Sequence, residues 1–136
     1  MVTRVAQQHK DGCGRAVLAM LTGTTYEAVD QLIPARDGKR DLELWQQERF
    51  LMERGWFQRV VLKREEADGV WPPRPFAPLH MAMVSSRGGP GHSVVMLSDG
   101  TVLDPNNPGG WRLTDWPIVY VVVGLVPPAL VPAGPS

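Results

Sequence analysis

This chain of 136 residues has a single cysteine, Cys13, and no excess of charge of either sign. One cysteine cannot form a disulfide within the chain, so the fold must be stable without one. The 14 lysines and arginines balance 14 aspartates and glutamates, which argues against nucleic acid or an anionic membrane as a partner. Metal-ligand spacings and phosphate-binding glycine loops are also missing, so we expect no metal and no cofactor.

Long apolar segments are scarce too. The longest apolar run covers residues 118–126, which is too short for a membrane span, so we expect no membrane insertion and interpret the run as a buried strand. The first twelve residues lack the apolar core of a secretion signal. Together with the lone cysteine, this predicts a cytoplasmic protein.

The chain length is typical of one domain, which can bury roughly two-thirds of its unfolded surface. We place that domain at residues 1–125. Residues 126–136 contain four prolines and little that could pack, so we predict an extended or disordered tail.

The first half of the chain has the patterns of three helices. The run after Gly14 holds strong helix formers and is apolar on nearly all sides, which predicts a buried helix. Thr24 and Glu27 fit a capping box at the start of a short second helix, which Pro34 ends. Apolar residues at helical spacing predict a third helix over residues 41–54, stopped by Gly55.

The second half has the patterns of strands, at residues 57–62, 79–85, 93–98, 101–103 and 118–125. Four prolines make residues 68–78 an irregular connection. The pair Asp99-Gly100 is a two-residue hairpin signal. Helices first and adjacent antiparallel strands afterwards predict an α+β fold, with N-terminal helices packed on a C-terminal antiparallel sheet.

Cys13 lies between two glycines at the start of the first predicted helix, and we interpret it as a nucleophile. A thiol at a helix N-terminus is near the positive end of the helix dipole and near unsatisfied N–H groups, which favour the reactive thiolate. Gly12 and Gly14 leave the approach to the sulfur open. Gln7, six residues upstream, offers a side-chain amide that a loop could bring back as an oxyanion donor.

A nucleophilic thiol needs a base, and the chain has three histidines. His9 lies in the loop before Cys13, and His80 lies inside an apolar strand, where a satisfied or an outward-facing histidine is the expected role. His92 opens a strand after a glycine loop, so its ring could face a cleft. Asp104 follows the next strand across the hairpin and could orient that ring, although the match in register is approximate and could require a bulge.

These residues resemble a known family. Gln7, Cys13-Gly14 opening an apolar helix, a Gly-His before a Val-rich strand, and Asp104-Pro105 after the next hairpin are similar to the papain-like cysteine peptidases that remove double-glycine leaders from bacteriocin precursors. The resemblance covers roughly residues 6–116. It implies that Cys13, His92 and Asp104 form a catalytic triad and that Gln7 and the Cys13 backbone N–H form the oxyanion hole. That family more often has Asp-Cys-Gly where this chain has Gly12-Cys13-Gly14.

The resemblance implies a papain-like fold and a stand-alone bacterial or phage thiol protease acting on a peptide or protein substrate. Two alternatives stay open. The same triad could serve an acyl transferase, amidase or isopeptidase, since the triad fixes the reaction and not the acyl group. The fold could also be a catalytically silent module for peptide binding or assembly.

Ordinary roles compete with these assignments. A lone helical cysteine is most often a small buried hydrophobe, and a turn aspartate is usually a backbone cap. We expect Arg15, Arg36 and Arg40 to be solvated charges.

Overall fold

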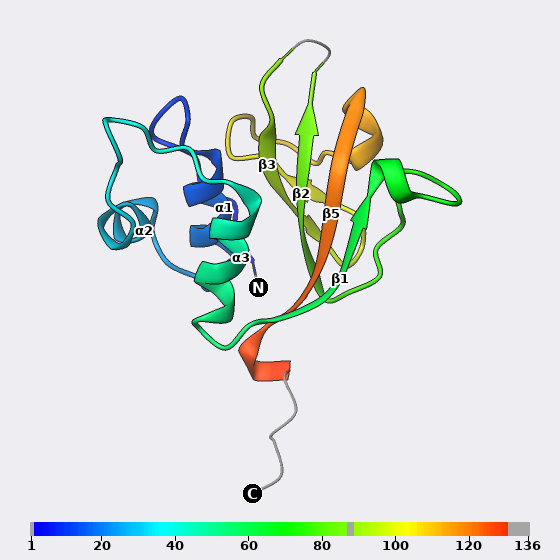
Figure 1. The fold of residues 1–136 in the computed structure, drawn as a ribbon, viewed down its shortest axis with the longest axis horizontal. Coiled ribbons are helices and arrows are strands. Elements are labelled where there is room, and N and C mark those ends of the chain that lie inside the picture. The colour runs from blue at the N-terminus through cyan, green and yellow to red at the C-terminus, as the bar shows by residue number, and fades with distance from the viewer. Residues whose placement is uncertain (1, 87–88, 131–136) are drawn as a thin grey trace, which may run out of the picture.

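The computed structural model describes residues 2–86 and 89–130 (Figure 1). Its helices all precede its strands, as predicted. The helices are α1 (Cys13–Thr22), α2 (Tyr26–Leu32) and α3 (Leu44–Met52), and the strands are β1 (Phe57–Lys63), β2 (Leu79–Ser85), β3 (His92–Leu97), β4 (Val102–Leu103) and β5 (Ile118–Val126). Short 3-10 turns lie at Arg64–Glu66, Leu113–Asp115 and Pro128–Leu130. The chain therefore has the predicted α+β class.

The strands form one antiparallel sheet in the order β1-β5-β2-β3-β4. The order follows the chain from β2 to β4, but β5 returns to lie between β1 and β2. Figure 1 shows the helices gathered on one side of this sheet. The other side is covered by irregular segments, which contribute Trp71, Phe76, Trp111 and Trp116 to the packing.

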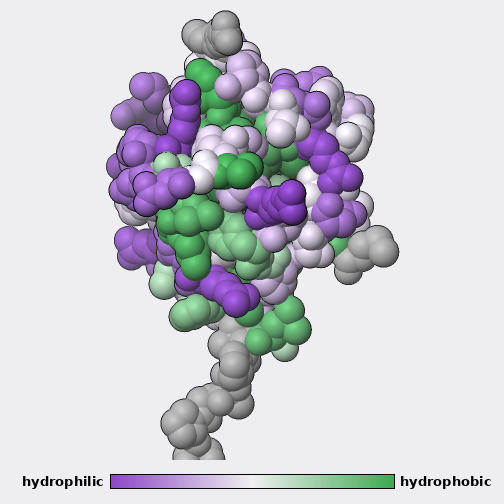
Figure 2. Space-filling view, turned by 90° about the vertical axis from the view of Figure 1, so that its right-hand side faces the viewer, coloured by the Kyte–Doolittle hydropathy of each residue, from purple (hydrophilic) through white to green (hydrophobic). Residues whose placement is uncertain are grey.

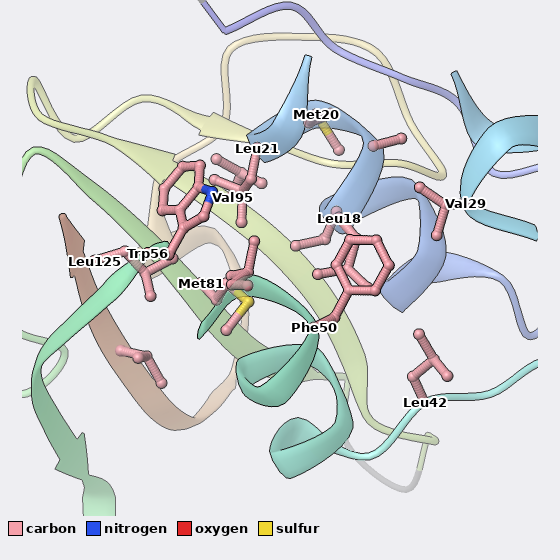
Figure 3. Close-up of a cluster of buried hydrophobic side chains, with 14 of the residues drawn as sticks. Leu18, Met20, Leu21, Val29, Leu42, Phe50, Trp56, Met81, Val95 and Leu125 are labelled. Carbon is pink, nitrogen blue, oxygen red and sulfur yellow. The ribbon is translucent and has the colours of Figure 1, made fainter. Parts of the chain in front are cut away.

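The main hydrophobic core lies between the helices and the sheet (Figure 3). Leu18 on α1 and Leu51 on α3 are completely buried there, together with Val95 and Val123 from the sheet. Alternating strand residues face opposite sides of a sheet, so Val94 and Val122 belong to the second core on the other face. The helix side of β3 thus fixes α1, and with it the position of Cys13.

Local capping explains where the helices begin and end. Gly23 ends α1 with φ 68°, a conformation that glycine adopts without strain. The cap of α2 is Thr25, whose side chain accepts from the Ala28 N–H at 3.1 Å, so the predicted cap at Thr24 was wrong by one residue. The third helix begins at Leu44 and not at 41, because Glu43 forms the capping box with Gln46.

The C-terminal end of the domain lies beyond the predicted limit. Val126 still belongs to β5 and pairs with Phe57, and Pro128–Leu130 form a 3-10 turn. The strand therefore extends one residue beyond the predicted limit, and residues 128–130 have regular local structure. The prediction for residues 131–136 falls outside the described residues.

The two edges of the sheet differ. β4 is only two residues long, whereas β1 is a full edge strand with Phe57 and Val60 exposed. Figure 2 shows the side of the molecule on which β1 lies, where apolar and polar side chains are mixed.

In the part of the chain that the structure describes, no helix has the length and apolar character needed to span a membrane.

Candidate active site

Cys13 is the first residue of α1 and is half-buried. The two glycines beside it make room for buried side chains and do more than open the approach to the sulfur. A Cβ at Gly12 would overlap the Tyr26 hydroxyl, and a Cβ at Gly14 would lie 2.9 Å from Gln47 Nε2. Gly12, where the resembling family more often has aspartate, is thus required by the packing of Tyr26.

His92 and Asp104 are in direct contact. His92 Nε2 lies 2.6 Å from Asp104 Oδ1. In the register of β3 and β4, Val95 pairs with Leu103, so the next pair would place Asp104 opposite Val94. His92 is two residues from Val94 and on the same face, which makes the two side chains diagonal neighbours. Their contact therefore needs no bulge, and the predicted complication in register was unnecessary.

Asp104 contacts Nε2 of the His92 ring, and Cys13 lines the same pocket as that ring. Burial disfavours the thiolate, but hydrogen bonds from His92 and from the Ser93 N–H, which lies 3.4 Å from Sγ, lower the pKa of Cys13 overall. Burial also disfavours the imidazolium, yet the hydrogen bonds to Asp104 and Cys13 raise the pKa of His92 to about 9. Near neutral pH these directions favour a thiolate–imidazolium pair.

Asp104 has the environment of a permanently charged carboxylate. Its burial disfavours the charge, but the hydrogen bond to His92 and the one accepted from the Asn106 N–H at 2.8 Å lower the pKa of Asp104. The residue is only 3% exposed. A buried carboxylate held in this way stabilises a positive imidazole ring beside it.

The three side chains open onto a pocket of about 850 Å³ at the N-terminal end of α1. Gln7 lies on the pocket wall as well, so the four residues selected from the sequence share one cavity. The remaining lining residues are mostly polar or small: Lys10, Asp11, Asp41, Ser85, Ser86, Pro90, Gly91, Asn106, Asn107 and Trp116. The pocket is wide enough for a segment of peptide beside the thiol.

Gln7 is in the pocket, but its amide is engaged. Its Nε2 donates to the carbonyls of His9 and Lys10, both at 3.0 Å, and its Oε1 is a buried atom without a hydrogen-bond partner among the described residues. The bond to the Lys10 carbonyl is solvent-exposed. Gln7 therefore holds the turn before Cys13, and donation to an oxyanion would require that exposed bond to open.

The other two histidines lie outside the pocket. His9 Nδ1 is 2.9 Å from the Tyr26 hydroxyl, in the loop that leads to Cys13. His80 is completely buried, and its ring contacts three backbone groups. His80 is thus the satisfied core histidine that its apolar strand predicted.

Arg15 was not predicted correctly. It is 1% exposed, donates to the Arg40 carbonyl at 2.9 Å and to the Ile33 carbonyl, and lies 3.4 Å from the Asp30 carboxylate. Arg40 is half-buried and also pairs with Asp30, at 3.1 Å. The sequence did contain a signal for this burial, because Arg15 lies in a run otherwise made of apolar residues. A charge buried in such a run needs a partner. These bonds fasten residues 30–40 against the first turn of α1.

Gln47 is the second residue that sequence reasoning missed. It is completely buried in α3, and its Nε2 donates to the Leu42 carbonyl at 3.2 Å and to Ser93 Oγ at 3.1 Å. Ser93 is the residue whose N–H reaches Cys13. Gln47 thereby links α3 to the strand that carries His92.

Comparisons with protein-family models and with curated proteins found no match for this chain. The resemblance to leader peptidases therefore stays a prediction. Among the described residues, no group of three or more histidine, cysteine, aspartate or glutamate side chains could hold a metal ion. The chemistry available in the pocket is that of a thiol together with an imidazole that contacts a carboxylate.

Proposed function

We propose that this chain is a papain-like cysteine peptidase that hydrolyses a peptide bond with Cys13, His92 and Asp104. The observation that carries the proposal is the 2.6 Å contact of His92 Nε2 with Asp104 Oδ1 in a pocket that Cys13 also lines. The N–H of Ser93, the residue after His92, lies 3.4 Å from the Cys13 sulfur. A cysteine acting only as a small hydrophobe would not be expected to share a pocket with a histidine held by a carboxylate. The position of Cys13 at the start of α1 adds the helix dipole to the forces that favour its thiolate.

In the proposed reaction, the Cys13 thiolate attacks the carbonyl carbon of the substrate, and the carbonyl electrons move to oxygen. The backbone N–H of Cys13 is one of the first N–H groups of α1, which have no acceptor within the helix, and it is available to the oxyanion. The Gln7 amide supplies a second donor when its exposed bond to Lys10 opens. When the C–N bond breaks, His92 transfers its proton to the leaving amine.

The acyl-thioester intermediate is then hydrolysed. Neutral His92 takes a proton from water as the water oxygen attacks the thioester carbonyl, and the C–S bond breaks to release the carboxylic acid and restore the thiolate–imidazolium pair. Asp104 keeps the ring aligned through both steps and stabilises its positive state. These steps use only side chains of the protein, its backbone N–H groups and water.

The same residues support two alternatives. An amidase, isopeptidase or acyl transferase would use the same thioester and differ only in the acyl donor or acceptor. The engaged amide of Gln7 favours the second alternative, a silent peptide-binding or assembly module, because an oxyanion hole with one donor fewer is a weaker catalyst.

Labelling tests the proposal. The protein is incubated with a peptide carrying a vinyl sulfone and, separately, with a random peptide library, and both are followed by mass spectrometry. We expect one adduct, on Cys13, and cleavage products that disappear in Cys13→Ser. An adduct without cleavage of any library peptide would favour the binding module, and cleavage that persists in Cys13→Ser would overturn the assignment of the nucleophile.

A further inference from the structure

The backbone of Asp104 accepts a hydrogen bond from Arg4, a residue near the N-terminus. Arg4 Nε donates to the Asp104 carbonyl at 2.7 Å, and Arg4 Nη2 donates to the Pro105 carbonyl at 3.2 Å. The Gln7 backbone N–H also donates to the Pro105 carbonyl, at 3.0 Å. Residues 4–7 therefore contact the backbone of the loop whose side chain reaches His92.

The backbone at this point needs such support. β4 contains only two residues, so the ladder of sheet hydrogen bonds ends before Asp104 is reached. Pro105 follows and has no N–H to donate. Both residues are buried, so their carbonyls need donors from the protein. The planar guanidinium of Arg4 supplies two at fixed angles, and charge-assisted bonds of this kind are shorter and stronger than neutral ones.

We propose that Arg4 is a positioning residue for the site: by holding the Asp104 and Pro105 carbonyls, it aims the Asp104 carboxylate at His92. This inference rests on the proposed function. Arg4 does not line the pocket, so it acts through Asp104 and not on the substrate. Small displacements of the acid matter, because the orientation of the ring that the acid holds sets the geometry of proton transfer.

The chain offers a matched control in Arg112. Its Nη1 donates to the Asp99 carbonyl at 2.8 Å, so it also fastens a loop of the β3–β4 hairpin through a backbone carbonyl. That loop is the turn at the opposite end of the hairpin from Asp104. Arg112→Ala removes a comparable bond and leaves the acid untouched.

The experiment compares wild type, Arg4→Ala, Arg4→Lys and Arg112→Ala. The first readout is the rate of Cys13 alkylation by iodoacetamide as a function of pH, which needs no substrate. In Arg4→Ala we expect the midpoint for thiolate formation to move to higher pH and the transition assigned to His92 to move below about 9. The other charged side chains of the pocket, Lys10, Asp11 and Asp41, are unchanged in all variants. Arg4→Lys keeps the charge but has a single donor nitrogen in place of the two that Arg4 uses, so it should lie between wild type and Arg4→Ala. Arg112→Ala should match wild type.

The second readout is peptide turnover, where Arg4→Ala should lower kcat about ten-fold with little change in KM. Thermal unfolding of each variant separates positioning from folding. If Arg4→Ala lowers the melting temperature but keeps the wild-type alkylation profile, the residue is only structural and the inference is wrong. If the profile shifts as expected but no variant cleaves any peptide, the inference on Arg4 holds and the proposed peptidase function fails.

Discussion

His80 and His92 lie on neighbouring strands but at opposite ends of the pair that β2 and β3 form. The hydrogen-bond partners of the His80 ring are backbone groups: its Nε2 accepts from the Phe76 and Ala77 N–H groups at 3.0 and 3.1 Å, and its Nδ1 lies 3.1 Å from the Met96 carbonyl. Two donors directed at Nε2 require a neutral ring with its proton on Nδ1. Burial accordingly lowers the pKa of His80.

His92 has the opposite surroundings. It faces a carboxylate and a thiol, and these raise its pKa to about 9 in spite of its burial. One sheet thus holds a neutral histidine that fixes a loop and a charged histidine beside a pocket. The comparison teaches that the partners of a ring, more than its depth, determine whether it is structural or chemical.

The largest effect should come from removing His92, the histidine that lines the pocket. We expect His92→Ala to lower peptide turnover by about 10,000-fold, because the variant has neither a base nor a proton donor for the leaving amine. The alkylation rate of Cys13 at neutral pH should fall as well, since the thiolate loses its counter-ion. Kinetics of the folded variant, with iodoacetamide labelling in parallel, measure both. Labelling that rises only above about pH 8 in wild type and is unchanged in His92→Ala would mean that no ion pair forms.

The next effect concerns the carboxylate that distinguishes the two histidines. Asp104→Asn keeps the shape of the side chain but lets the ring take the wrong tautomer, so turnover should fall on the order of 1,000-fold with little change in melting temperature. NMR titration of the ring should show the pKa of His92 below its wild-type value of about 9. Full activity in this variant would make Asp104 a turn residue and Asn106 or Asn107 the candidate orienter.

Local sequence patterns predicted the positions of the candidate residues wherever their contacts are local. Cys13 at a helix start, and His92 and Asp104 across the Asp99-Gly100 turn, follow from capping and hairpin rules, because few residues separate the partners. The same rules gave the strands and the three helices to within a few residues.

Contacts between distant parts of the chain were not predictable in this way. Nothing in the local pattern pairs Arg4 with Asp104, a hundred residues away, or inserts β5 between β1 and β2. The buried pair of Arg15 and Asp30 shows the same limit, since the polarity of a side chain does not reveal its partner. Within the site, the contact of His92 with Asp104 is local, whereas the approach of Cys13 to the His92 strand and the bonds of Arg4 are long-range.

Replacing Gln7 tests whether the pocket beside His92 contains an oxyanion donor as well as a reactive thiol. Gln7→Ala should lower kcat about 100-fold, the usual cost of one oxyanion donor, while labelling of Cys13 stays nearly intact. The exposed bond from Gln7 to the Lys10 carbonyl makes this donor available at small cost. Equal losses of labelling and turnover would mean that Gln7 only holds the turn before Cys13 and does not donate to the oxyanion.

At the other end of the β2–β3 pair, His80→Leu should destabilise the fold but leave peptide turnover unchanged. Leucine fills most of the space but accepts no hydrogen bond, so the N–H groups of Phe76 and Ala77 lose their acceptor, at a cost of about 2 kcal/mol. Urea unfolding measures this loss, and turnover per folded molecule should equal that of wild type. His80→Gln, whose amide oxygen can accept in place of Nε2, should recover part of the stability. Loss of turnover in a fully folded His80→Leu protein would break the division between the two histidines.

The smallest effect is the pH dependence of that stability. The pKa of His80 is lower in the folded protein than in the unfolded chain. Below about pH 6.5 the unfolded chain therefore binds a proton at His80 that the folded protein does not bind. The contribution of His80 is therefore complete above about pH 6.5 and shrinks as the pH falls. His92 and Asp104 also make stability depend on pH, so the useful quantity is the difference between wild type and His80→Leu, from which their contributions cancel. Urea unfolding at about pH 7.5 and about pH 5 should show that this difference narrows on acidification, whereas a constant difference would mean that His80 is protonated in the fold as readily as in the unfolded chain.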